Sequence, residues 1–248
     1  MNVIINKIRY RLSCSLCSLA VLILNKTTHR NYPISLDAWR CADLSFSQFG
    51  EDLLIARALE SLKKTERAYY VDVGAFDPFL FSNTCRLRQL GWNGINVDAQ
   101  SKHIEIFNKN CPDYINIHAA VYSESGTEKF LCYNYGATGR LAKADLSTSQ
   151  SVLGESVIEV RDVSVVTLTQ ILSKHAPLER PFGLLSIDCE GADFEVLKSN
   201  DWEKYKPWIV AIEDSSLHEE IVGSFLKNYG YELFAIARLT KIYVNRSL

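Results

Sequence analysis

Apolar residues recur with two different periods between residues 47 and 121. The segment SQFGEDLLIARALESLKK repeats them at the spacing of a helix, with Phe49 and Leu53 on one face. Short apolar runs of strand length follow at AYYVDV, GINVD and YINIHAAV. The segments between them predict a helix over Asn83 to Leu90 and a helix that Ser101 caps. This alternation predicts a parallel, doubly wound sheet.

The second half of the chain resumes the alternation after a polar interruption. Residues 123 to 156 are rich in small and polar residues and contain one predicted hairpin strand, TEKFLCYN. The polar run after it is either a lid over a site or a surface insertion. The next predicted strands are VIEVRDVSVV, FGLLSID and WIVAIED, with helices over Thr167 to His175 and after Gly191. A helix closed by Gly230 then precedes YELFAIAR and TKIYVN, which we interpret as a final antiparallel pair.

Length, charge and cysteine usage narrow the class of protein. The chain has 248 residues, 47% of them apolar, which suffices for one sizeable α/β domain with a buried core. Its formal net charge is −2 and it has no basic block, so we expect no nucleic-acid partner. Seven cysteines cannot all pair within one chain, and the only close pair, Cys14 and Cys17, lacks the second pair of a zinc site. We therefore predict a reduced, cytoplasmic protein.

The first 43 residues differ from the remainder, and we expect the folded domain to span residues 44–248. Lys7, Arg9 and Arg11 precede an apolar stretch from Leu12 to Leu24. The stretch is shorter than the about 20 apolar residues of a membrane span, and no small-residue cleavage site follows it. We expect residues 1–43 to be a basic and apolar segment with a linker. Its helix either packs on the domain or, through residues 1–30, lies on the cytoplasmic face of a membrane, and a cleaved signal peptide is the less favoured alternative.

Acidic side chains follow the predicted strands at their carboxyl ends, where open α/β sheets bind their ligands. Asp72 and Asp188 emerge from otherwise apolar strands, where an unpaired charge costs several kcal/mol, so we interpret both as functional. Asp77 alone has an equally good interpretation as a turn former. The residues that the strands deliver to this edge are Asp72, Gly74, Asp77, Asp98, Ala119, Ala120, Asp188, Glu190, Glu213 and Asp214.

The chemistry of this edge distinguishes between cofactors. A pyrophosphate site needs the three glycines of G-x-G-x-x-G, whereas this turn has only Gly74 between two acids, and no P-loop occurs. The absence of these glycines disfavours an NAD-dependent sugar-modifying enzyme, which is the main alternative to the cofactor considered next. S-adenosylmethionine has no phosphate and carries a sulfonium and an ammonium, which carboxylates attract. Asp98, placed 24 residues after Gly74 (98 − 74), can accept hydrogen bonds from both ribose hydroxyls, and the backbone of Ala119 to Val121 can flank the adenine.

Five segments, in order, resemble the FkbM-type S-adenosylmethionine-dependent methyltransferases: SQFGEDLLI, YVDVGAFDPFLFSNT, GWNGINVDA, LLSIDCEGADFEVL and IVAIE. The resemblance covers residues 44 to 244. It implies a class I methyltransferase (Rossmann-like) fold, with a mostly parallel seven-stranded sheet, an antiparallel final strand pair and helices on both faces. One departure from the family pattern is Phe76, where the family often has Asn.

The resemblance also implies an activity and a set of site residues. The activity is methylation of a hydroxyl, most often on a sugar of a glycan, glycolipid or secondary metabolite. A non-catalytic glycan-binding or protein-binding module with the same fold is the alternative. The cofactor-binding candidates in the matched motifs and strand ends are Gln48, Asp72, Gly74, Ala75, Asp77, Ser82, Asn83, Asp98, Ala120 and Asp188.

Methylation of an alcohol requires help in removing its proton near neutral pH. Asp188 and Glu190 are the candidates for the base, Glu213 is a third carboxylate and His218 is a further candidate. These carboxylates would suit magnesium or calcium rather than zinc, but we do not favour a metal. A lipid-linked acceptor would explain a membrane-bound N-terminal segment.

The remaining histidines and Cys189 have structural interpretations. His118 is expected to pack in the core, and His103 and His175 to lie on the surface. Cys189 lacks a preceding proline and is interpreted as a bystander.

Overall fold

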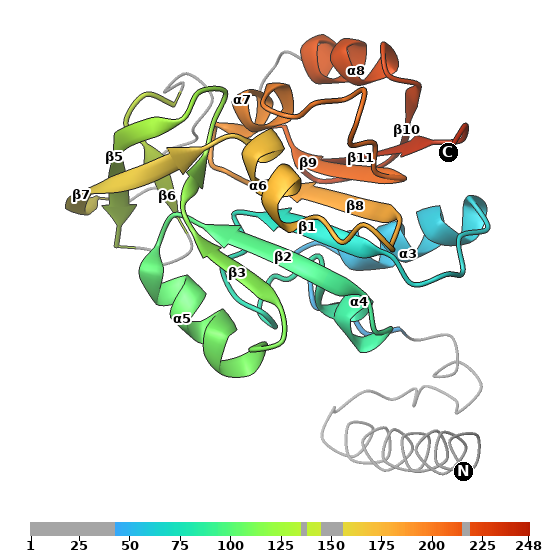
Figure 1. The fold of residues 1–248 in the computed structure, drawn as a ribbon, viewed down its shortest axis with the longest axis horizontal. Helices are drawn as coiled ribbons and strands as arrows, with labels where there is room; N and C mark the ends of the chain where they lie inside the picture. Colours follow the sequence, from blue (N-terminus) through green and yellow to red (C-terminus); the bar gives the residue numbers. More distant parts are fainter. Residues whose placement is uncertain (1–42, 135–137, 145–155, 215–218) are drawn as a thin grey trace, which may run out of the picture. The chain divides into compact units, whose positions relative to one another are not determined.

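The computed structural model describes residues 43–134, 138–144, 156–214 and 219–248. Its main sheet has seven strands in the order β10-β11-β9-β8-β1-β2-β3 (Figure 1). All neighbouring pairs from β9 to β3 are parallel, whereas β11 pairs antiparallel with both β9 and β10, which confirms the predicted C-terminal pair. The strands of this sheet are β1 (Tyr69–Val73), β2 (Asn93–Asp98), β3 (Ile115–His118), β8 (Phe182–Ile187), β9 (Ile209–Glu213), β10 (Tyr231–Ala237) and β11 (Thr240–Asn245).

Helices cover both faces of the main sheet, because its central strands are apolar on both sides. Tyr70 and Val71 are successive buried residues of β1 that point to opposite faces. Tyr70 packs in a cluster with α3 and α4, and Val71 in a cluster with α6, α7 and α8. The helices are α3 (Glu51–Ser61), α4 (Cys85–Gln89), α5 (Ser101–Asn110), α6 (Leu168–His175), α7 (Asp193–Lys198) and α8 (Glu219–Lys227).

A second sheet of four strands, in the order β4-β7-β5-β6, interrupts the α/β alternation (Figure 1). Its strands are β4 (Ala120–Val121), β5 (Gly126–Tyr133), β6 (Gly139–Leu141) and β7 (Val157–Val166). The β5 hairpin strand is confirmed. However, β7 pairs antiparallel with β5, so it belongs to this insertion and not to the resumed parallel alternation. Most of the predicted polar run before β7 lies outside the described residues.

Two local predictions about elements are wrong. The predicted third strand, from Tyr114 to Val121, is divided, since Ala119 donates its N–H to the carbonyl of Asp98 and the chain then joins the second sheet. Ser101 is the first residue of α5 and does not cap it, because Gln100 occupies the cap position. The carboxylate of Asp98 holds the N–H of Gln100 at 2.7 Å and so fixes the turn one residue earlier.

Three side chains also lie in environments that differ from those predicted. Phe49 lies before α3 and is 42% exposed; the buried apolar side chains of α3 are Ile55, Ala58 and Leu59. His118 is exposed, and its Nε2 lies 3.1 Å from the carbonyl of Ala99. His103 is buried, because it packs under the end of β2 beside Asp98.

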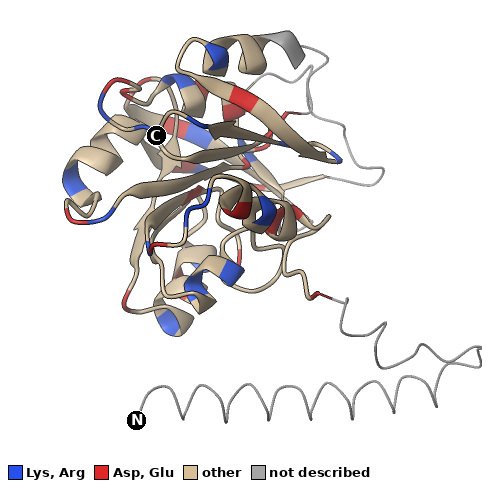
Figure 2. Cartoon of the chain, turned by 90° about the vertical axis from the view of Figure 1, so that its right-hand side faces the viewer, with Lys and Arg blue, Asp and Glu red and all other residues tan. Residues whose placement is uncertain are grey.

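Charged residues of both signs are spread along the described chain. Figure 2 shows basic and acidic residues interspersed over the ribbon in this view. Residues Ser45–Leu248 form one compact unit by their internal contacts. Within the described ranges, no helix is both long and apolar enough to cross a membrane.

Candidate active site

A cleft of about 200 Å³ opens at the carboxyl ends of β1, β2 and β8, between the main sheet and the second sheet. Phe76 and Phe81 border it from the turn after β1, and Phe130 and Leu141 from the second sheet. The insertion therefore forms one wall of the site. The predicted site residues that line the cleft are Gln48, Gly74, Asp98, Ala120, Asp188 and Glu190.

The turn after β1 brings the ends of β1 and β8 into contact. The N–H of Asp188 donates to the carbonyl of Val73 at 3.0 Å. Gly74 has φ +79°, and a Cβ at this position would lie 1.7 Å from the carbonyl oxygen of Asp188. Only glycine fits such a left-handed position with backbone this close. Gly74 and Ala75 both donate their N–H to the carbonyl of Val97, so the same turn is also fixed to β2.

The other predicted residues of this turn lie behind the cleft and hold its shape. Asp72 is 5% exposed and accepts a hydrogen bond from Thr84 Oγ1 at 2.8 Å, and burial raises the pKa of its carboxyl group. Ser82 accepts the N–H of Cys85, and Asn83 donates its Nδ2 to Ser186 Oγ. The side chains of Asp72, Ala75, Asp77, Ser82 and Asn83 are not among the cleft-lining residues.

Asp77 has the geometry of a turn former. Its Oδ1 accepts the N–H groups of Phe79 at 2.8 Å and Leu80 at 2.9 Å. The side-chain oxygen is therefore used within its own loop, as an Asx turn requires. This geometry supports the turn interpretation that the sequence left open.

Asp98 is held from three sides at the end of β2. Its Oδ2 accepts the N–H of Phe76 at 3.0 Å, its Oδ1 accepts the N–H of Gln100 at 2.7 Å, and His103 Nδ1 lies 3.0 Å from Oδ1. The rings of His103 and Phe76 also pack at nearly a right angle, with centroids 4.9 Å apart. Phe76 has φ +51°, which is uncommon for a non-glycine residue, and these contacts hold it there. Phe76, His103 and Asp98 thus form one assembly, and the burial of His103 is the part that sequence reasoning missed.

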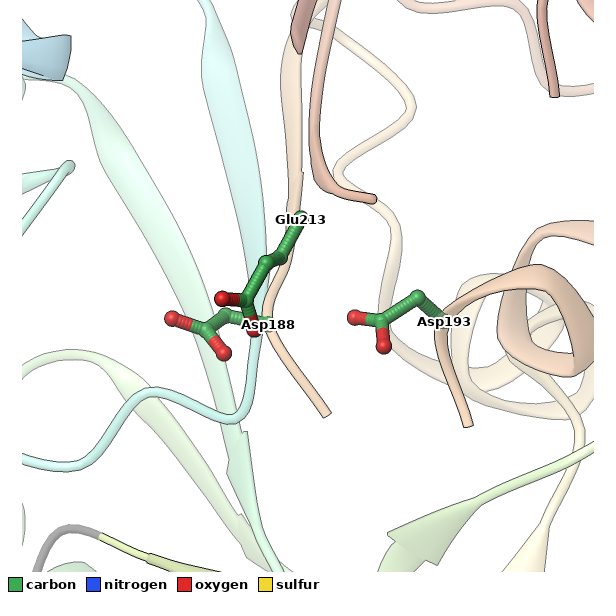
Figure 3. A group of neighbouring side chains, drawn as sticks. All are labelled: Asp188, Asp193 and Glu213. Atoms are coloured by element: carbon green, nitrogen blue, oxygen red, sulfur yellow. The ribbon is translucent and has the colours of Figure 1, made fainter. Parts of the chain in front are cut away.

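Three carboxyl groups meet on the other side of the cleft (Figure 3): Asp188 after β8, Asp193 at the start of α7, and Glu213 at the end of β9. Each offers an oxygen within 4.8 Å of the others. Asp193 accepts the N–H of Cys189 at 2.8 Å and of Gly191 at 3.0 Å. These two hydrogen bonds shape the turn that carries Glu190, a role of Asp193 that the sequence did not predict. Carboxylate oxygens at this spacing are ligands of the kind that magnesium or calcium take.

Burial and mutual repulsion raise the pKa of each of these three acids. Asp188 is open to the cleft but otherwise surrounded by protein, and this burial raises the pKa of its carboxyl group. Burial, followed by the charge of Asp188, raises the pKa of Asp193 to about 7. Burial, followed by the charges of Asp188 and Asp193, raises the pKa of Glu213 to about 10. Glu213 therefore keeps its proton at neutral pH and donates it in a hydrogen bond to Asp188.

The remaining candidates differ in position. Glu190 lines the cleft from a left-handed turn, with φ +50°. Glu213 is not among the lining residues and contacts the cleft through Asp188. His218 lies outside the described residues. Burial raises the pKa of the Cys189 thiol well above its usual value, so a thiolate nucleophile is disfavoured at neutral pH.

The strand order, with its antiparallel C-terminal pair and a cleft over the carboxyl ends of the parallel strands, is that of a class I methyltransferase. A family model described as the methyltransferase FkbM domain matches residues 72–233, from β1 to β10. The chain therefore belongs to the FkbM methyltransferase family, and the family implies S-adenosylmethionine as methyl donor. Searches of curated proteins and of solved structures found no match.

Proposed function

We propose that the chain binds S-adenosylmethionine in this cleft and transfers its methyl group to a hydroxyl, on a sugar of a glycan, glycolipid or secondary metabolite. The observation that carries the proposal is the cleft itself. Asp98 and Asp188 face it from opposite sides, on either side of the Gly74 turn. A cationic ligand without phosphate suits these carboxylates, whereas a pyrophosphate would be repelled.

Asp98 is the proposed ribose-binding residue. Oδ1 accepts the N–H of Gln100 and lies beside His103 Nδ1, and Oδ2 accepts the N–H of Phe76, which orients the carboxylate and leaves a lone pair of Oδ2 for a ribose hydroxyl. Ala119, Ala120 and Val121 line the same cleft and would flank the adenine. The acids at Asp188 and Glu190 would then lie toward the methionine end, where the sulfonium and ammonium carry positive charge.

Asp188 and Glu190 are the proposed bases. The acceptor O–H gives its proton to a carboxylate, the O–CH3 bond forms as the S–CH3 bond breaks, and S-adenosylhomocysteine leaves with a neutral sulfur. Most of the rate can come from holding oxygen, methyl and sulfur in line. The proton on Glu213 serves to hold Asp188 in place, and Glu213 itself does not take the acceptor proton while it is protonated. No metal is required by this scheme.

The proposed setting is cytoplasmic. Among the described residues, Cys85, Cys111, Cys132 and Cys189 are all free thiols, and three of them are buried. Buried thiols that behave as small apolar side chains are usual in a reducing compartment.

Transfer of a labelled methyl group tests the proposed bases. Extracts containing glycans and glycolipids are incubated with the chain and with S-adenosylmethionine labelled in its methyl group, and labelled products are sought by mass spectrometry. We expect labelled sugars with the wild type, and a loss of at least about a hundredfold in rate with Asp188→Asn or Glu190→Gln, because general-base catalysis contributes that much. Asp162→Asn, an exposed position on β7, is the matched control and should retain the rate. Full transfer in both variants, with cofactor binding intact, would refute the assignment.

Cofactor titration separates this proposal from its two rivals. An NAD-dependent enzyme would be stabilised against heat by NAD and not by S-adenosylhomocysteine. A non-catalytic module would bind neither cofactor.

A further inference from the structure

Apolar side chains are exposed around the mouth of the cleft. Phe79 and Leu80 are each 53% exposed and Phe81 is 47% exposed, in the loop between β1 and α4. Phe49 is 42% exposed before α3. Phe81 and Gln48, the neighbour of Phe49, line the same cleft, so both segments border its mouth. We call Phe49, Phe79, Leu80 and Phe81 the apolar rim.

Hydrogen bonds fix the loop of the apolar rim with these side chains outward. Asp77 accepts the N–H groups of Phe79 and Leu80. Ser82 donates its N–H to the carbonyl of Phe46 at 3.0 Å. These hydrogen bonds therefore hold the apolar side chains of the loop in water. Their exposure costs free energy unless another apolar surface covers them.

The place where the N-terminal segment joins the folded unit indicates what covers the rim. Phe46, whose carbonyl holds the loop at Ser82, directly follows Ser45, the first residue of the unit. The sequence before it contains the apolar stretch from Leu12 to Leu24, which directly follows the basic residues Lys7, Arg9 and Arg11. Basic residues next to an apolar stretch too short to span are typical of segments that bind a lipid surface. Two features with the same preference for lipid are thus connected at one point of the molecule.

Positive charge also accompanies the apolar rim. The guanidinium of Arg238, in the turn between β10 and β11, lies 4.6 Å from the ring centroid of Phe49. The acids nearest in sequence, Glu51 and Asp77, are used by backbone N–H groups of the rim: Glu51 accepts that of Phe49, and Asp77 accepts those of Phe79 and Leu80. Aromatic and basic side chains together suit the headgroup region of an anionic bilayer.

We propose that the apolar rim docks on the surface of a lipid bilayer, so that the cleft receives its acceptor hydroxyl from a lipid-linked substrate in that bilayer. The choice of substrate class rests on the proposed methyl transfer, whereas docking itself does not. With Phe81 both in the rim and in the wall of the cleft, a headgroup sugar would reach the site along this side chain.

Co-sedimentation with vesicles tests the docking. The full chain is mixed with vesicles of phosphatidylcholine and phosphatidylglycerol, and the bound fraction is compared with that of Phe79→Ser/Leu80→Ser, two positions that do not line the cleft. Losing two half-exposed apolar side chains should weaken partition by about tenfold or more. The matched control is Leu90→Ser/Leu178→Ser, which removes two exposed leucines at the opposite edge of the main sheet and should partition as the wild type. Phe79→Trp/Leu80→Trp should keep or strengthen partition, because tryptophan favours the bilayer interface.

Several outcomes would overturn the proposal. Equal partition of the serine variant and the wild type would show that other residues carry the binding. A wild-type chain that stays in the supernatant would exclude bilayer docking. A wild type that is a dimer, together with a serine variant that is a monomer, would show that a second copy of the chain covers the rim instead. Calorimetry with S-adenosylhomocysteine is run on the same samples. Unchanged cofactor binding with failed vesicle binding refutes docking alone, and absent cofactor binding in the wild type refutes the proposed function.

Discussion

The proton that Glu213 holds beside Asp188 should make the protein less stable as the pH rises. The ordinary pKa of a glutamate is 4.5 and that of Glu213 is raised to about 10, first by burial and then by Asp188 and Asp193. Between pH 6 and pH 8 the group is thus ionised in the unfolded chain and protonated in the folded one. The folded state binds one more proton, so the free energy of unfolding falls as the pH rises.

The magnitude follows from one proton over two pH units. Each unit changes the free energy of unfolding by about 1.4 kcal/mol per proton, so Glu213 alone accounts for a loss of about 3 kcal/mol between pH 6 and pH 8. Glu213→Gln keeps the shape and the hydrogen-bond donor of the protonated acid but does not titrate. Relative to the wild type, this variant should therefore be about 3 kcal/mol more stable at pH 8 than at pH 6. Asp193 also titrates near this range, but it is present in both chains.

Urea unfolding at the two pH values measures this difference, provided that the slope with urea is the same in both chains. Glu105→Gln, on the exposed side of α5, is the matched control and should show the wild-type pH dependence. The same pH dependence in Glu213→Gln and in the wild type would mean that Glu213 is ionised in the folded protein, and the description of a shared proton would be wrong.

Three further predictions concern the cleft. His103→Ala should weaken S-adenosylhomocysteine binding about tenfold by calorimetry, since it releases the Asp98 carboxylate. His103→Asn should restore part of the affinity through its side-chain N–H. Equal affinities in the wild type and both variants would exclude a positioning role for His103. Gly74→Ala should lower the free energy of unfolding by more than about 3 kcal/mol in urea, because its Cβ would lie 1.7 Å from a backbone oxygen, and a smaller loss would show that the turn adapts. Millimolar EDTA should leave cofactor affinity unchanged, and a loss that magnesium reverses would instead assign a metal to Asp188, Asp193 and Glu213.

The main sheet was predictable because its strands are buried on both faces. Runs such as those of β1 and β8 are buried along their whole length and apolar except at Asp72 and Ser186, and no long-range partner has to be known to recognise them. The strands of the second sheet are different. β7 is largely exposed over its first half, so its sequence does not indicate which strand it pairs with, and its partner β5 is fixed only in three dimensions.

The site was predictable to the extent that strand ends determine it. Asp98 and Asp188 follow apolar strands and reach the cleft, as expected from sheet geometry alone. The burial of His103 was not predictable, because it depends on which face of the short helix α5 packs under β2. Asp193 was missed for a similar reason, since its hydrogen bonds to Cys189 and Gly191 exist only once the turn is folded.

Calorimetric titration of the full chain with S-adenosylhomocysteine tests whether the cleft is a cofactor site. We expect binding at one site per chain, with affinity at least about tenfold lower in Asp98→Ala, because each lost hydrogen bond to a charged group costs about 1.5 to 3 kcal/mol. Asp162→Asn should bind as the wild type. A folded wild-type chain that shows no binding at millimolar ligand, or an Asp98→Ala variant that binds with wild-type affinity, would contradict the assignment of the cleft as a cofactor site.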